Sequence, residues 1–485
     1  MKLFEKLIKI AISPEALDNF LNENINEIID FQNESYSLVI NEKELIQLFI
    51  TEKGEILRNL NYETSYNKAF ISILFDFCER FGFINTVRIN TIITDNEIII
   101  GHRLKSAKLY LLNITNNNDL INRFDEICTN LEYALENEED NERKINITFA
   151  NYIGYVVKNT NTLTVSAFIN KIQQAVSNNN YKFISSDFIK SIIKINYSVL
   201  DDAFIILQDL IESYFLRNNL IFNNPASYLI EEGTNYVALL ESAASNFHSI
   251  RKISVNQFAL INDTNVFYTL LRGVKIIENE NQLFSYFNSY GLMHHKKLVT
   301  SFKHLPQYIF SKNPHFIDWG CGQGMASMTL LEYLNDNEIS HSISQITLIE
   351  PSQIALKRAS LHVSKFINNT KIINTINKDL DSLAAKDFLK ENKTRIHLFS
   401  NVLDMDVFSL SKLVELIKTN FSGENYFLCV SPYITDLKTA RIDSFVNAFS
   451  ANEGFEEIEK QNNKAYSWIR EKDWTRVLRV FKCNI

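Results

Sequence analysis

The first half of the chain shows mainly the spacing of amphipathic helices. Ser13-Pro14-Glu15 predicts a helix start, because Ser suits the N-cap and Pro the first helical position, and helical spacing continues to about residue 31. Between later helices, 86–100 and 105–112 carry β-branched alternation, which predicts a small hairpin or sheet. Apolar residues at three- and four-residue intervals predict further helices at about 42–60, 64–82, 119–137, 164–178, 185–195, 200–217 and 234–248.

One stretch of this half has no apolar residues. Residues 136–144 (ENEEDNERK) are typical of a solvated loop, and a charged helix end is an equally good interpretation. A chain of 485 residues exceeds the size of one hydrophobic core. We therefore predict three domains: a mostly helical one with a small β element at 1–140, a helical, substrate-selecting region at 145–280, and a third domain at 281–485.

After about residue 306 the pattern changes to short apolar runs that alternate with helical segments. This change predicts an α/β domain with a doubly wound, seven-stranded sheet that follows a mostly α-helical region. The final two strands are expected to pair at an antiparallel edge. The predicted strands lie near 315–319 and at 345–349, 371–376, 395–400, 425–430, 455–460 and 476–483.

The most specific motif is a glycine-rich turn between the first of these strands and a helix (HFIDWGCGQGMASMTLLEYL, from residue 315). Glycines let such a loop turn sharply and let its backbone touch a bulky ligand. A dinucleotide-binding GxGxxG would need its third glycine at position 325 or 327, but the chain has Met325 and Ser327 there. The spacing therefore disfavours an NAD-dependent oxidoreductase.

This turn resembles motif I of class I (Rossmann-like) S-adenosylmethionine-dependent methyltransferases, and the resemblance covers the chain from about 306 to 485. It implies S-adenosylmethionine as the cofactor. Glu350 stands where the family has its ribose-binding acid, and Asp379 where a polar group meets the adenine, although KDLDS equally fits a helix N-cap. The cofactor-binding residues that the resemblance implies are Asp318, Gly320, Cys321, Gly322, Gly324, Glu350, Asp379 and Asn401.

Catalytic residues are harder to predict, because methyl transfer from a sulfonium can be catalysed largely by alignment of the reactants. Where a base is needed, His294, Asp404 and Tyr433 are the candidates by their expected nearness to the pocket. His294 belongs to a predicted helix at 284–302, in which Tyr290 and Lys296 are further pocket candidates and His295 is an alternative base. Ordinary packing and surface roles are equally open for these helix residues.

Composition narrows the partners. A formal net charge of -8 argues against a large nucleic-acid footprint. The five cysteines never form a CxxC, so neither a metal site nor a disulfide framework is indicated, and reduced cytoplasm fits best. No apolar run approaches the roughly 20 residues of a membrane span, and the N-terminus lacks a secretory signal.

Two functions stay open at this point. The first is an active methyltransferase whose N-terminal region selects a protein, RNA or small-molecule acceptor and offers a surface to a protein partner. The second is a catalytically inactive protein that keeps the methyltransferase fold as an interaction or assembly module. Cofactor binding without turnover would favour the second.

Overall fold

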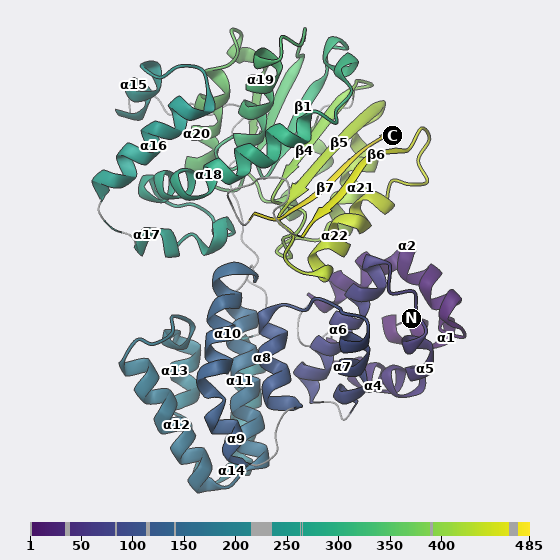
Figure 1. Cartoon of the computed structure of the whole chain (residues 1–485), viewed down its shortest axis with the longest axis vertical. Coiled ribbons are helices and arrows are strands. Elements are labelled where there is room, and N and C mark those ends of the chain that lie inside the picture. The colour runs from purple at the N-terminus through teal and green to yellow at the C-terminus, as the bar shows by residue number, and fades with distance from the viewer. Residues whose placement is uncertain are drawn as a thin grey trace. The chain divides into compact units, whose positions relative to one another are not determined.

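The computed structural model describes residues 2–33, 39–82, 85–112, 117–139, 142–214, 235–261, 263, 265–388, 391–464 and 474–485. The chain divides into two compact units (Figure 1). The N-terminal unit comprises residues 1–219 and 434–440, and the C-terminal unit comprises 220–433 and 441–485. The boundary predicted near residue 140 therefore falls inside the N-terminal unit, and the region predicted at 145–280 is divided between the two.

The N-terminal unit is helical throughout the part of it that the structure describes. Ser13 caps one of its helices as the sequence predicts, since its Oγ accepts the Ala16 N–H at 3.2 Å. The helices are α1 (Leu3–Ile10), α2 (Pro14–Gln32), α4 (Lys43–Glu52), α5 (Gly54–Arg58), α6 (Ser65–Phe81), α7 (Thr86–Asp95), α8 (His102–Leu111), α9 (Asn117–Asn122), α10 (Phe124–Asn137), α11 (Glu142–Asn159), α12 (Thr162–Ser177), α13 (Asp187–Ile193) and α14 (Leu200–Tyr214).

The predicted β element is wrong, because α7 and α8 occupy its two segments. The sequence of α7 fits both the two-residue alternation of a strand and the three- to four-residue spacing of a helix. Its buried Ile89, Ile92 and Ile93 lie at helical spacing, and α7 packs against α6. β-branched residues lower helix propensity by only a fraction of about 1 kcal/mol each. Packing against α6 therefore outweighs the local preference for strand.

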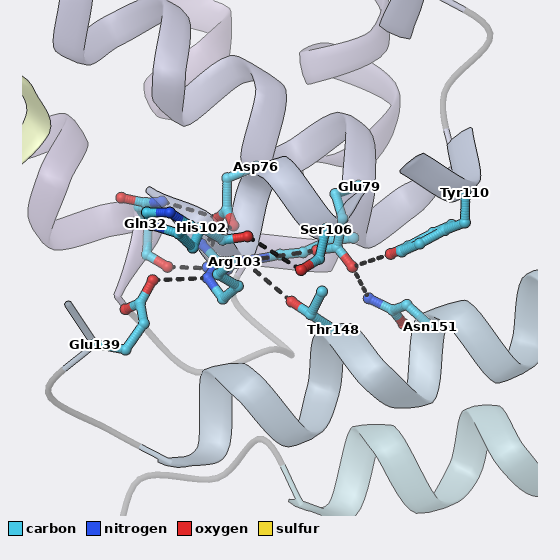
Figure 2. Close-up of polar contacts among 11 residues, drawn as sticks. Gln32, Asp76, Glu79, His102, Arg103, Ser106, Tyr110, Glu139, Thr148 and Asn151 are labelled. Atoms are coloured by element: carbon cyan, nitrogen blue, oxygen red, sulfur yellow. Dashed lines mark hydrogen bonds and ion pairs between the residues drawn. The ribbon is translucent and has the colours of Figure 1, made fainter. Parts of the chain in front are cut away.

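Buried charges cross the core of the N-terminal unit (Figure 2). Arg103 of α8 donates to Asp76 at 2.6 Å, to Glu139 at 2.9 Å and to Thr148 Oγ1 at 3.2 Å. Asp76 also accepts from Gln32 at 2.8 Å. These bonds connect α2, α6, α8 and α11. The polar groups of the cluster are thus hydrogen-bonded to one another, and the role of the cluster is structural.

The same network corrects the loop predicted at 136–144. Glu138 is buried and bonds the backbone N–H and the ring of His102, and Glu139 pairs with Arg103. Residues 136 and 137 are exposed and end α10, and α11 begins at Glu142, so the described ends of this charged run belong to helices, in keeping with the alternative of a charged helix end. Glu138 is buried here because its partner His102 belongs to α8, which local composition does not reveal.

The C-terminal unit is an α/β structure. Its strands are β1 (His315–Trp319), β2 (Gln345–Ile349), β3 (Ile373–Ile376), β4 (Arg395–Ser400), β5 (Glu424–Ser431), β6 (Glu456–Asn463) and β7 (Arg476–Asn484). Its helices are α15 (Asn235–Glu241), α16 (Phe247–Ile261), α17 (Asn265–Tyr268), α18 (Glu280–Phe302), α19 (Met325–Asp336), α20 (Gln353–Ser364), α21 (Leu410–Asn420) and, from Arg441 onward, α22 (Asp436–Asn447).

The strands form one sheet in the order β3-β2-β1-β4-β5-β7-β6. β1 to β5 are parallel, and β7 pairs antiparallel with β5 and β6. Alternate residues of β1 enter different cores, since Phe316 packs in one cluster with α18, α19 and α20, and Ile317 in another with α21. The sheet is therefore covered on both faces, which confirms the predicted doubly wound, seven-stranded fold.

Candidate functional site

All the predicted cofactor residues lie in or beside the loops at the carboxyl ends of β1 to β4. Parallel strands end at one edge of a sheet, so these loops are neighbours. The chain reverses its strand order between β1 and β4, and ligands of open α/β sheets bind at such a reversal. The loop between β1 and α19 occupies this place.

The three glycines of this loop serve different purposes, although each has a left-handed backbone (φ 62° at Gly320, 52° at Gly322 and 76° at Gly324). A Cβ at Gly320 would lie 2.9 Å from Val402 Cγ2, and one at Gly324 would lie 3.1 Å from the backbone of Ala359 in α20. A Cβ at Gly322 would meet nothing within 4 Å. Gly320 and Gly324 therefore allow close packing, whereas Gly322 faces open space.

Asp318 connects β1 to the first turn of α19. Its Oδ2 accepts the backbone N–H of Ser327 at 3.0 Å and the Ser327 hydroxyl at 2.8 Å. Its Oδ1 is buried without a hydrogen-bond partner among the described residues. Burial raises the pKa of Asp318 to about 7, although the two hydrogen bonds from Ser327 act to lower it. A donor or cation placed before this loop would satisfy Oδ1.

Glu350 follows β2 and bonds the glycine loop directly. Its Oε2 accepts the Gly322 N–H at 3.0 Å, and its Oε1 accepts the Ser352 N–H at 3.0 Å. Burial, and to a smaller extent the nearby Asp318, raises the pKa of Glu350 to about 7. Cys321 is buried, and its N–H donates to the Ile349 carbonyl at 2.9 Å. The loop and the end of β2 are therefore held together.

Asp379 caps a short 3-10 turn at Leu380–Ser382, in keeping with the N-cap alternative. Its carboxylate accepts the Ser382 N–H at 2.7 Å and the Ser382 hydroxyl at 3.0 Å. Asn377, two residues earlier, donates to the carbonyls of Glu350 and Pro351 at 2.9 Å each. The end of β3 is thereby fixed to the loop that follows β2.

Asn401 directly follows β4 and has a left-handed backbone, with φ 58°. Asn tolerates this conformation better than most residues, although it costs roughly 1 kcal/mol or more. Its N–H donates to the Val430 carbonyl at 2.7 Å, and its Oδ1 is buried without a hydrogen-bond partner among the described residues. Like Asp318, it presents an unsatisfied acceptor at the carboxyl edge of the sheet.

One face of α18 runs along this edge. Tyr286, Tyr290, His294 and Lys297 follow one another at four-, four- and three-residue intervals, which places them on one side of the helix. Ring centroids are 5.3 Å apart for Tyr286 and Tyr290 and 6.2 Å for Tyr290 and His294. Burial, then Tyr290 and Glu350, raises the pKa of Tyr286. The row therefore begins near the end of β2.

The row ends near the loop after β4. Burial lowers the pKa of Lys297 to about 8, while the charge of Asp404 opposes this shift. Its Nζ has no hydrogen-bond partner in the described part of the chain, and the residue is 1% exposed. Asp404 itself is buried. Lys296, the lysine predicted to line the pocket, is exposed, and the buried residue is Lys297, which helical spacing from His294 indicates.

The two histidines of α18 differ. Burial, with the neighbouring Lys297, lowers the pKa of His294 to about 3, so this ring is neutral near pH 7 and a weak base. His295 instead bonds Glu332 at 2.9 Å and stacks on Phe247 at 3.9 Å between centroids. His295 therefore packs α18 against α16 and α19.

Tyr433 lies just beyond β5. Its N–H donates to Thr475 Oγ1 at 3.0 Å, and the Thr475 hydroxyl donates back to its carbonyl at 2.8 Å. The Lys464 ammonium lies 4.9 Å from the centroid of its buried ring. The segment that leads into β7 thus fixes Tyr433 at the carboxyl edge.

None of the helices in the described ranges is both long and apolar enough to cross a membrane. In the same ranges, no group of three or more His, Cys, Asp or Glu is arranged to hold a metal ion. All five cysteines are buried free thiols.

The sheet order, the antiparallel β7 and the glycine loop after β1 define a class I S-adenosylmethionine-dependent methyltransferase fold for the C-terminal unit. No protein-family model and no curated protein sequence matches the chain. Among solved structures, a putative Haloferax volcanii methyltransferase in complex with the Trm112 activator is similar at 13% identity, with 43% of this chain and all 100% of that chain covered and a TM-score of 0.29. The magnesium protoporphyrin IX methyltransferase of Synechocystis is similar at 12% identity, with 48% of this chain and 97% of that chain covered and a TM-score of 0.28. A putative rRNA methylase of Clostridium thermocellum is similar at 12% identity, with 41% of this chain and 97% of that chain covered and a TM-score of 0.26.

Proposed function

We propose that this protein is an S-adenosylmethionine-dependent methyltransferase whose C-terminal unit binds the cofactor at the carboxyl edge of the sheet. One observation carries the proposal: the space before Gly322 is open, and the edge around it presents two buried acceptor oxygens, Asp318 Oδ1 and Asn401 Oδ1, without hydrogen-bond donors. Unsatisfied buried acceptors each cost about 1–3 kcal/mol. A ligand that carries ammonium and hydroxyl groups would supply the missing donors.

In this proposal the glycine loop and the first turn of α19 hold the amino-acid part of the cofactor through backbone amides. Glu350 exchanges its bond to the Gly322 N–H for the ribose hydroxyls, and Asp379 lies toward the adenine. The cofactor supplies an electrophilic methyl group on a sulfonium. Asp404, His294 and Tyr433 belong to the side of the site that receives the acceptor.

Calorimetric titration of S-adenosylmethionine and S-adenosylhomocysteine tests the proposal, with Gly322→Asn as the variant. Asn is among the least strained residues at positive φ, so the fold should survive while the new side chain fills the open space. Gly82→Asn is a matched control, because Gly82 also has a left-handed backbone (φ 64°) and no atom within 4 Å of an added Cβ.

We expect wild type and Gly82→Asn to bind both compounds equally, and Gly322→Asn to bind at least tenfold more weakly. Absence of binding to the wild-type chain at millimolar concentration would overturn the proposal. Binding without turnover on a broad panel of acceptors would instead support the interaction-module alternative.

A further inference from the structure

The C-terminal unit contains a pocket of about 410 Å³ with a mostly aromatic wall. It is lined by Phe258 of α16, Phe267 and Tyr268 of α17, and Ser289 and Tyr290 of α18. Its volume falls in the range of small-molecule sites, which is about 300–1,000 Å³. Aromatic walls gain most from a flat aromatic ligand, which stacks on them or meets them edge to face.

Tyr290 connects the pocket to the row of side chains on α18, because it lines the pocket and also contacts His294. The Tyr290 ring lies 5.6 Å from Phe267 in the pocket wall and is nearly parallel to the His294 ring, at 6.2 Å and 18°. Lys297 follows one turn later on the same face. At 1.5 Å of rise per residue, Tyr290 and Lys297 are roughly 10 Å apart along the helix axis. This is the length of two or three fused rings.

Lys297 ends this row as a buried amine that lacks a hydrogen-bond partner in the described ranges. An unpaired buried ammonium costs several kcal/mol, so a position that only needed packing would be better served by Met or Leu. Two ionisable groups act on its charge: Asp404 favours it, and Arg476 opposes it, whereas the neighbouring His294 is neutral near pH 7. Arg476 already donates to Thr300 at 2.8 Å and to Ser301 at 3.3 Å.

We propose that the acceptor is a small fused-ring aromatic molecule with an acidic hydroxyl group, bound with its rings against Tyr290 and the aromatic pocket, and that Lys297 is the catalytic residue that removes the hydroxyl proton. This inference rests on the proposed methyltransferase function. Lys297 Nζ takes the proton from the acceptor oxygen. That oxygen then bonds the methyl carbon as the carbon–sulfur bond breaks, the electron pair of this bond stays on the sulfur of the departing S-adenosylhomocysteine, and the lysine passes its proton to water.

The lysine role is tested with Lys297→Met and with Lys296→Met as a matched control, since the two lysines are adjacent and only Lys297 is buried. The probe is 7-hydroxycoumarin, a fluorescent two-ring phenol, with 7-methoxycoumarin as its non-ionisable counterpart. Binding to the cofactor-free protein is followed by fluorescence, methyl-ether formation by mass spectrometry, and S-adenosylmethionine binding by calorimetry.

We expect Lys296→Met to behave as wild type. Lys297→Met should bind the cofactor within twofold of wild type, lose at least 100-fold in turnover, which is within the usual range for a general base, and no longer prefer 7-hydroxycoumarin over 7-methoxycoumarin. Lys297→Arg should not restore turnover, because a guanidinium keeps the charge but cannot take the proton.

Two outcomes would overturn the inference while leaving cofactor binding intact. If wild type binds S-adenosylmethionine but neither binds nor methylates 7-hydroxycoumarin or 2-naphthol, the acceptor class is wrong. If Lys297→Met keeps turnover within threefold of wild type, Lys297 is not the base. Failure of the wild-type chain to bind S-adenosylmethionine would be a different result, which overturns the proposed function itself.

Discussion

Replacing Asp318 with Asn should make the C-terminal unit more stable at alkaline pH and at the same time weaken its binding of the cofactor. The native protein holds this carboxyl group in a buried place, with a pKa of about 7. In the unfolded chain an aspartic acid has a pKa near 3.9. Asn keeps the size of the side chain and an oxygen for the Ser327 N–H, but it has no charge to bury.

The direction of the pH dependence follows from the number of protons that the native and the unfolded states bind. Between pH 4 and 7 the native state holds a proton on Asp318 that the unfolded state has released, so the free energy of unfolding of wild type falls as the pH rises. Above pH 7 the loss in the free energy of unfolding is complete. It corresponds to the difference of about three units between the native and unfolded pKa values of Asp318, or up to about 4 kcal/mol. Glu350, whose pKa is also raised to about 7, adds a similar decline that the variant keeps. The variant should therefore lose about half as much stability across this range as wild type.

Urea denaturation between pH 5 and 8.5, followed by tryptophan fluorescence, measures this difference. All three tryptophans belong to the C-terminal unit, and Trp319, next to Asp318, is fully buried. Asp336→Asn is the control, because Asp336 lies exposed at the end of α19. We expect Asp318→Asn to exceed wild type by about 2–4 kcal/mol at pH 8 and by less at pH 5. If wild type instead gained stability from pH 5 to 8, and the variant were the weaker protein at pH 8, Asp318 would be ionised and paired in the native state and the reasoning would fail.

Three further predictions concern other parts of the chain. Arg103→Met removes the guanidinium shared by the buried Asp76, which keeps its ion pair with Arg80, and the half-buried Glu139. It should cost the N-terminal unit about 3 kcal/mol in unfolding followed by far-ultraviolet circular dichroism, with the tryptophan transition unchanged; a loss below about 1 kcal/mol would contradict the assigned network. Ser13→Ala removes the cap on the Ala16 N–H and should cost about 1 kcal/mol in the same assay, most of which Ser13→Asp should restore. Because all five cysteines are buried, a thiol reagent should modify fewer than one per native molecule within minutes and all five in denaturant.

The sequence predicted the C-terminal sheet well because its central strands are buried on both faces. Such strands are continuous apolar runs, and the predicted bounds of β2 (345–349) and β4 (395–400) match the structure. Each run is followed by glycine or polar residues that mark where the strand ends. The carboxyl edge of the sheet could therefore be located before any coordinates were known.

The N-terminal unit was harder to predict, since its stability depends on partners distant in sequence. Arg103 lies between the two segments that were predicted as strands, and its partners are 27 residues earlier, at Asp76, and 36 residues later, at Glu139. A local pattern contains neither partner. For the same reason, the charged run at 136–144 fitted a solvated loop and a charged helix end equally well, and its sequence did not reveal that Glu138 is buried.

The prediction of Lys296 in place of Lys297 shows which kind of information was missing. Phe287, Gly291 and Leu298 are buried on α18, and counting helical turns from them would have put position 297 on the inner face and position 296 outside. The phase of the helix was therefore present in the sequence. What makes Lys297 a candidate base is the combination of burial and a missing hydrogen-bond partner, and both depend on how α18 lies against the loop after β4. The unfavourable burial of the Lys297 amine is best explained by a ligand that interacts with it and offsets the free energy of burial. The acceptor should therefore be sought among molecules that carry an acidic proton.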